Sequence, residues 1–192
     1  PAQVWTAGAA SHQGWMVLIV GNRIQAVGPR AGVTAPPDAQ HIALPGMTVL
    51  PGLMDLHSHL LLHPYNETSW NDQVSREGLA LRVARATNHL RSTLMAGFTT
   101  TRDLGTEGAQ YADVELKQAV NQGIIPGPRM LASGPALSIT GGHGDENFLA
   151  PQFNYSDEGV ANGVDGVMTK VRNIVPLGGF TLRNGMYRKE LG

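Results

Sequence analysis

Two histidines stand two positions apart where an apolar segment ends, in the sequence Leu-Met-Asp-Leu-His-Ser-His that finishes at His59. Side chains two apart on an extended strand point to the same face, so His57 and His59 should project together. Imidazole nitrogens are common ligands of zinc. Asp55 would lie behind them on the same face and orient a ring. The pattern therefore predicts a divalent-metal centre, with zinc as the expected ion, rather than two polar residues where a strand meets solvent.

The composition limits the classes of function. Of the 192 residues, 42% are hydrophobic, which is ordinary for a globular protein. A net charge of −1 provides no basic surface for nucleic acid. Because the chain has no cysteine, a metal must use histidine, carboxylate or modified lysine. No apolar stretch approaches the roughly 20 residues that span a membrane, so we expect a cytoplasmic protein, although the start at Pro1 leaves open a processed leader.

Residues 1–48 have the pattern of a small β unit. Gly21-Asn22 is typical of a two-residue hairpin turn, and the apolar segments 15–20 and 23–27 flank it. The sequence His-Ile-Ala-Leu at 41–44 predicts another short strand. We therefore expect this part to fold as a β unit distinct from the rest.

From Val49 onward the pattern alternates between strands and helices. Along the longest helix, apolar residues recur at spacings of three and four. His89 falls off that stripe, so we expect it in solvent. Such alternation favours parallel strands with helical crossovers, and it predicts an α/β fold with a partial TIM-like (β/α) barrel over residues 49–177. The expected elements are a buried strand at 49–56, a helix at 75–95, a strand at 98–102, a helix at 112–122 and a strand at 130–132.

Polar residues follow three successive predicted strands. His57 and His59 come after the first, Asp103 after the second and His143 after the third. In (β/α) barrels the chemistry lies at the carboxyl ends of the strands, so this placement supports a site. Arg102 and Asp103 would orient groups near the metal, or form an ion pair that closes the strand end.

Two residues on loops are candidates for contact with a substrate. Tyr65 lies on the loop after the histidine pair, where it would touch substrate or merely pack and cap. His143 lies in the glycine-rich loop 134–144. We prefer a role for His143 in the loop or at the substrate to a role as third metal ligand.

Several motifs, taken in order, resemble one family. They are Leu-Pro-Gly-Leu-Met-Asp-Leu-His-Ser-His at 50–59, Gly-Phe-Thr-Thr-Thr-Arg-Asp-Leu-Gly at 97–105, Gly-Pro-Arg-Met at 127–130 and Gly-Gly-His-Gly-Asp at 141–145. Over roughly residues 3–174 the chain is similar to the amidohydrolase superfamily, in its imidazolonepropionase-like and metal-dependent prolidase-like branch.

The resemblance implies a fold and an activity. Members of the superfamily join a β-sandwich, built from both chain ends, to a TIM-like barrel. They hydrolyse amide bonds with a water activated by one or two divalent metals, usually zinc. By this similarity His57 and His59 would be metal ligands, and the substrate would be a small cyclic amide or dipeptide.

The chain also departs from the superfamily. A full barrel needs roughly 200 to 250 residues, and only residues 49–192 are left for it. The resemblance implies later ligands, namely a carboxylated lysine, two histidines and an aspartate, yet no histidine follows His143. We therefore expect little or no amide hydrolysis by this chain alone.

The last residues admit two interpretations. Asn184-Gly185 is a second hairpin signal, which predicts that residues 178–192 join the N-terminal β unit. This would fit an internal deletion, whereas an out-of-frame end is the other explanation. Two alternatives to the enzyme also stay open: a non-catalytic fragment that assembles with itself as a homo-oligomer or with another protein, and a metal-binding module without turnover.

Overall fold

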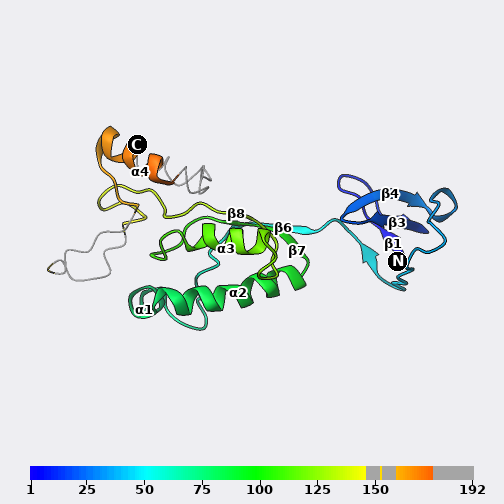
Figure 1. Cartoon of the computed structure of the whole chain (residues 1–192), viewed down its shortest axis with the longest axis horizontal. Coiled ribbons are helices and arrows are strands. Elements are labelled where there is room, and N and C mark those ends of the chain that lie inside the picture. The colour runs from blue at the N-terminus through cyan, green and yellow to red at the C-terminus, as the bar shows by residue number, and fades with distance from the viewer. Residues whose placement is uncertain (146–151, 153–158, 175–192) are drawn as a thin grey trace. The chain divides into compact units, whose positions relative to one another are not determined.

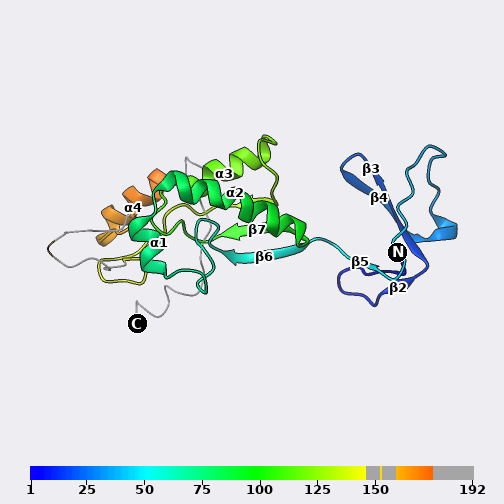
Figure 2. The ribbon, with the colours of Figure 1, turned by 90° about the horizontal axis from the view of Figure 1, so that it is seen from below.

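A computed structural model describes residues 1–145, 152 and 159–174. The contacts divide the chain into two compact units, Pro1–Gly52 and Leu53–Gly192. Figures 1 and 2 show the ribbon of both units from two directions. The expected contribution of residues 178–192 lies outside the described residues. Within the described part, no helix is long and apolar enough to cross a membrane.

The first unit consists of short strands. The predicted hairpin at Gly21-Asn22 is confirmed: two antiparallel strands meet there, and Gly21 adopts a φ of 60°. Residues 41–44 form no strand, so that prediction is wrong; Ile42 stays exposed, and no packing stabilises an extended conformation. The elements are β1 (Gln3–Val4), β2 (His12–Gln13), β3 (Trp15–Val20), β4 (Arg23–Pro29), a 3-10 helix (Arg30–Gly32) and β5 (Thr48–Val49), arranged as the sheets β2-β1-β5 and β3-β4.

The second unit confirms the alternation of strands and helices. Its parallel sheet has the order β6-β7-β8. Helix α2 packs against β7 and α3 against β8, as the ribbon shows (Figure 1). The elements are β6 (Leu53–Ser58), α1 (Trp70–Arg76), α2 (Leu79–Met95), β7 (Phe98–Asp103), α3 (Ala112–Asn121), β8 (Arg129–Leu131) and α4 (Gly163–Ile174).

The core of this unit lies between the helices and the strand ends. Ala86 and Leu90 on α2 are fully buried, and Val83 packs beside them, so the stripe on this helix faces the core as its spacing predicts. The buried cluster consists of Leu60, Leu61, Ala86, Leu90, Ala109, Ala112, Leu116 and Met130.

The helix predicted at 75–95 is two helices. Helix α1 ends at Arg76, and Glu77 has an extended backbone. Gly78 then caps the start of α2. The sequence carried a signal for α1 that the apolar spacing concealed: the Ser69 hydroxyl accepts a hydrogen bond from the backbone N–H of Asp72 at 3.2 Å, as N-capping serines do.

The strand predicted at 49–56 is also divided. Its first residue, Val49, belongs to β5, residues 53–56 belong to β6, and residues 50–52 between them form no strand. The prediction that it is buried is wrong, since Met54 is 64% exposed and Leu53 and Leu56 are exposed too. The reason is that β6 is an edge strand of the described sheet and pairs only with β7 there.

Candidate metal centre

The structure brings His57 and His59 together at the end of β6. Their ring centroids lie 5.5 Å apart, with an angle of 66° between the ring planes. His57 is within the strand, and His59 follows its last residue, Ser58. Pairing with β7 fixes this end, because the Ser58 carbonyl accepts a hydrogen bond from the N–H of Leu104 at 3.0 Å. The two-residue period of the strand therefore places both imidazoles on one side, as expected.

The ring of His59 is oriented by the loop after β7. Its Nδ1 lies 3.0 Å from the carbonyl oxygen of Gly105. Because a carbonyl oxygen can only accept, Nδ1 is the donor in this contact, and in the neutral ring the lone pair is then on Nε2. Histidines that bind metals usually donate their other ring N–H to a carbonyl or carboxylate in this way. The donor chemistry of His59 thus fits a metal ligand that binds through Nε2.

Glu107 is a second partner of His59 that the sequence analysis missed. Its Oε1 lies 3.3 Å from His59 Nδ1, and its Oε2 accepts a hydrogen bond from the indole N–H of Trp70 at 3.2 Å. Glu107 also adopts a φ of 51°, which is uncommon for a residue with a Cβ. The only hint in the sequence is its position between Gly105 and Gly108.

Gly105 is needed at this point of the loop for two reasons. Its φ is 150°, in a region that favours glycine. A Cβ there would lie 3.2 Å from Glu107 Oε1 and 3.8 Å from His59 Cε1. The missing side chain therefore leaves room for the Glu107 carboxylate beside the imidazole.

Asp55 and Arg102 contact the backbone of β6. The Asp55 carboxylate accepts a hydrogen bond from the N–H of His57 at 3.1 Å. Arg102 Nε donates to the carbonyl of Leu56 at 2.7 Å. These two contacts hold the strand that carries the histidines.

Asp103 is fully buried and joins the loops after β6 and β7. Its two carboxylate oxygens accept hydrogen bonds from the backbone N–H groups of Leu60 and Gly105, each at 3.1 Å. Burial, followed by repulsion from Asp113, raises the pKa of Asp103 well above its usual value. Among the described residues, Asp103 forms no ion pair with Arg102; it links the backbone of the two loops instead.

Asp113 is a further buried carboxylate, at the start of α3. It accepts hydrogen bonds from the backbone N–H groups of Val114, Ser133 and Gly134 at 2.8, 3.0 and 2.8 Å. Burial raises the pKa of Asp113 as well, against the effect of these hydrogen bonds. The residue fixes the loop after β8 to α3.

The two candidate substrate residues lie on the surface of the chain. Tyr65 is 66% exposed, and His143 is exposed on its loop. Within the described ranges, no group of three or more His, Asp or Glu side chains is arranged to hold a metal ion.

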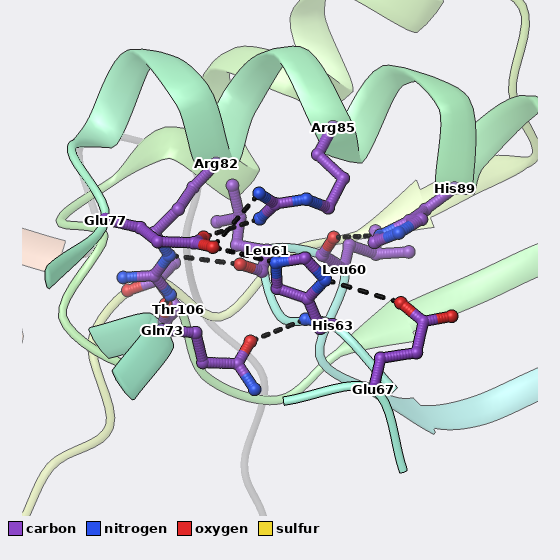
Figure 3. Close-up of polar contacts among 10 residues, drawn as sticks. All are labelled: Leu60, Leu61, His63, Glu67, Gln73, Glu77, Arg82, Arg85, His89 and Thr106. Atoms are coloured by element: carbon purple, nitrogen blue, oxygen red, sulfur yellow. Dashed lines mark hydrogen bonds and ion pairs between the residues drawn. The ribbon is translucent and has the colours of Figure 1, made fainter. Parts of the chain in front are cut away.

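A second polar cluster lies between the loop after β6 and α2 (Figure 3). His63 Nε2 lies 2.8 Å from Glu77 Oε1, and Arg85 donates two hydrogen bonds to the same carboxylate at 2.6 and 3.1 Å. Arg85 and then His63 lower the pKa of Glu77. His89, expected in solvent, is half-buried and donates from Nδ1 to the carbonyl of Leu60 at 3.1 Å. The helical spacing alone did not reveal that the loop after β6 lies against α2 at this residue.

An open hollow of about 330 Å³ adjoins this cluster. His59, His63 and His89 line it, together with Leu60 and Leu62. The hollow thus lies between the candidate metal ligand His59 and His89 on α2.

Comparison with known proteins finds several similar chains. Ochratoxinase from Aspergillus niger is 38% identical over 101 residues, which cover 50% of this chain and 19% of that protein. A crystal structure of a Xaa-Pro dipeptidase with methionine bound in its active site has a TM-score of 0.77 at 28% identity, over 93% of this chain and 44% of the other. A prolidase complexed with N-methylphosphonate-L-proline has a TM-score of 0.74 at 33% identity, over 93% and 43%.

These similarities confirm both the resemblance and the fold class expected from the motifs. The chain spans about a fifth of the length of ochratoxinase and less than half of each of the two solved chains. The mixed α/β structure, with its partial sheets, is similar to part of amidohydrolase TIM-barrel proteins. A sequence model of the amidohydrolase family matches residues 48–178, and the chain therefore belongs to this family of hydrolases that act on C–N bonds.

Proposed function

We propose that this chain carries the first two metal ligands of a zinc-dependent hydrolase that cleaves the amide bond of dipeptides or small cyclic amides. The observation that carries the proposal is the pair of imidazoles at the end of β6, with His59 Nδ1 bound to the Gly105 carbonyl. Membership of the amidohydrolase family supports cleavage of a C–N bond. Similarity to a prolidase and a Xaa-Pro dipeptidase favours a peptide substrate.

The chain's own residues have separate tasks in this proposal. His57 and His59 bind the ion, and the Gly105 carbonyl keeps the proton of His59 on Nδ1 so that Nε2 faces the ion. Glu107 adds a negative charge beside the ring. When bound, a divalent ion supplies a Lewis acid that polarises the amide carbonyl and lowers the pKa of water.

The ligand count limits the activity of this chain alone. Catalytic zinc sites usually have three protein ligands, and the described residues supply His57 and His59. We therefore propose that the chain binds one ion weakly and hydrolyses amides poorly or not at all.

A zinc titration of the purified chain tests the metal ligands. We compare the unmodified chain with the double variant His57→Ala/His59→Ala. The double variant His12→Ala/His41→Ala is the matched control, because it removes the same number of histidines from the other unit. We expect one zinc ion per chain for the unmodified protein and the control, and none for the first variant. Equal uptake by all three proteins would refute the proposal.

A hydrolysis assay tests the limit on activity. The same three proteins are incubated with zinc and with Xaa-Pro dipeptides or cyclic amides. We expect no turnover above that of His57→Ala/His59→Ala. Turnover well above that variant would mean that this chain completes a catalytic site.

Self-assembly is the second candidate function, and the exposed apolar side chains of β6 favour it. Leu53, Met54 and Leu56 are apolar yet exposed on this edge strand, and such edges readily pair with another chain. Light scattering tests this: we expect a dimer or larger species that Met54→Lys converts to monomer, while Ile124→Lys, at an exposed residue after α3, has no effect. A monomer at all concentrations for the unmodified chain excludes this function.

A further inference from the structure

Arg82 is a buried cation that the proposed metal chemistry does not use. It lies on α2 and is only 2% exposed. Its Nε donates to the carbonyl of Leu61 at 3.0 Å, and its Nη2 donates to the carbonyl of Thr106 at 3.0 Å (Figure 3). One guanidinium therefore holds two loops that are distant in sequence.

These two loops are the ones that orient His59. Leu61 lies two residues after His59 on the loop that follows β6. Thr106 directly follows Gly105, whose carbonyl accepts the Nδ1 proton of His59. The distance between the two loops thus decides whether the imidazole reaches its acceptor.

The planar fork of arginine suits this task. Its N–H groups lie in fixed directions, so one side chain can donate to two carbonyls at once. Lysine presents a single ammonium on a flexible stem and does not reproduce the fork. A purely structural arginine would stabilise the unit without a specific effect on one imidazole.

We propose that Arg82 is a positioning residue, which fixes the loops after β6 and β7 so that His59 keeps its proton on Nδ1 and presents Nε2 to a metal ion. This inference rests on the proposed function only in taking His59 as the ligand. The link between Arg82 and the tautomer of His59 holds without any ion.

The first test is made on the metal-free chain by nitrogen NMR of the imidazoles. We compare Arg82→Lys and Arg82→Met with Arg91→Met, which removes an exposed arginine from the same helix. We expect His59 to be protonated on Nδ1 in the unmodified chain and in Arg91→Met. In both Arg82 variants we expect a mixture of the two tautomers. Folded Arg82 variants with an unchanged His59 signal would overturn the proposal.

The second test is the zinc affinity of the same proteins. Loss of a group that orients a ligand typically weakens metal binding by about 10- to 100-fold. We expect a loss in that range for the Arg82 variants and less than about twofold for Arg91→Met. An affinity of the folded Arg82 variants equal to that of Arg91→Met would contradict the proposal.

Two further measurements distinguish a failure of this inference from a failure of the variants to fold and from a failure of the proposed function. If the Arg82 variants do not fold, hydrogen exchange of the unmodified chain decides: we expect slow exchange of the Arg82 Nε proton, and exchange as fast as that of Arg91 refutes the link. If the unmodified chain binds no zinc, the proposed function fails, while the tautomer of His59 still tests Arg82.

Discussion

The backbone of Gly105 binds two polar side chains near the first two strand ends. Its carbonyl accepts the proton of His59, and its N–H binds the carboxylate of Asp103. His59 is therefore oriented by the backbone, and the backbone is in turn held by a buried carboxyl group. Because burial disfavours the ionised form of this group, the pKa of Asp103 is raised.

The raised pKa of Asp103 predicts a dependence of stability on pH. The ordinary pKa of an aspartate is near 3.8. Above that pH, the unfolded chain releases the Asp103 proton, which the folded chain still holds. Stability contributed by this group is therefore present at low pH and falls as the pH rises through the raised pKa. We measure the free energy of unfolding in urea from about pH 4 upward. We expect Asp103→Asn to remove the part of its decline with rising pH that the titration of Asp103 causes.

Asp103→Asn should also lower the free energy of unfolding at the pH where the chain is most stable. An amide has one acceptor oxygen for the two N–H groups of Leu60 and Gly105, so one of them loses its partner. An unsatisfied buried donor costs about 1–3 kcal/mol. The exposed Asp165→Asn is the control and should change neither property. If the free energy of unfolding of Asp103→Asn changes with pH in parallel with that of the unmodified chain, the predicted effect of Asp103 on the pH dependence is contradicted.

Helix α2 has two tasks along its length. Ala86 and Leu90 fill the core, while Arg82 and His89 contact the carbonyls of the loop after β6. The helix therefore couples the packing of the unit to the position of that loop.

Truncation of the core residue Leu90 should be costly. It is fully buried, and removal of a buried leucine side chain destabilises by about 2–5 kcal/mol. Leu81→Ala is the matched control, because Leu81 lies on the same helix and is 54% exposed. We expect this control to stay within about 0.5 kcal/mol in urea unfolding. Equal losses for the two variants would place the core elsewhere.

Gly127 allows α2 and α3 to approach the segment before β8. A Cβ there would lie 2.9 Å from Val120 Cγ2 and 3.3 Å from Leu90 Cβ. We expect Gly127→Ala to destabilise by about 1–3 kcal/mol through overpacking. Gly32→Ala, where no atom lies within 4 Å, serves as the control. If both variants have the melting temperature of the unmodified chain, the space around Gly127 is larger than the structure indicates.

The whole chain consists of two contact units that divide at Gly52. The first is held by short antiparallel and parallel strand pairs, and the second by helices packed on a parallel sheet. Each unit should therefore unfold in its own transition.

Tryptophan fluorescence distinguishes the two transitions. Trp5 and Trp15 lie in the first unit, and Trp70 lies in the second. In a Trp5→Phe/Trp15→Phe background, which reports on the second unit, we expect Leu90→Ala to lower the midpoint. In a Trp70→Phe background, which reports on the first unit, the midpoint should not change. A shift of equal size in both backgrounds would mean that the units unfold together.

Three local features of this protein follow from its sequence alone. The spacing of His57 and His59 places both rings on one side of β6, because the side-chain period of a strand is fixed by the backbone. The turn at Gly21-Asn22 and the core stripe of α2 follow from local conformational preference and from helical periodicity in the same way. The family, too, was recognisable from short motifs in order.

The tertiary structure decided which groups surround the histidines. Gly105 meets His59 across 46 positions of the chain, and Arg82 meets Leu61 and Thr106 across 21 and 24. Contacts of this separation depend on how the loops after β6 and β7 pack on α2, and no local pattern encodes them. For the same reason the burial of Asp103 and the exposure of Met54 on the edge strand β6 became evident only once the strands had their neighbours.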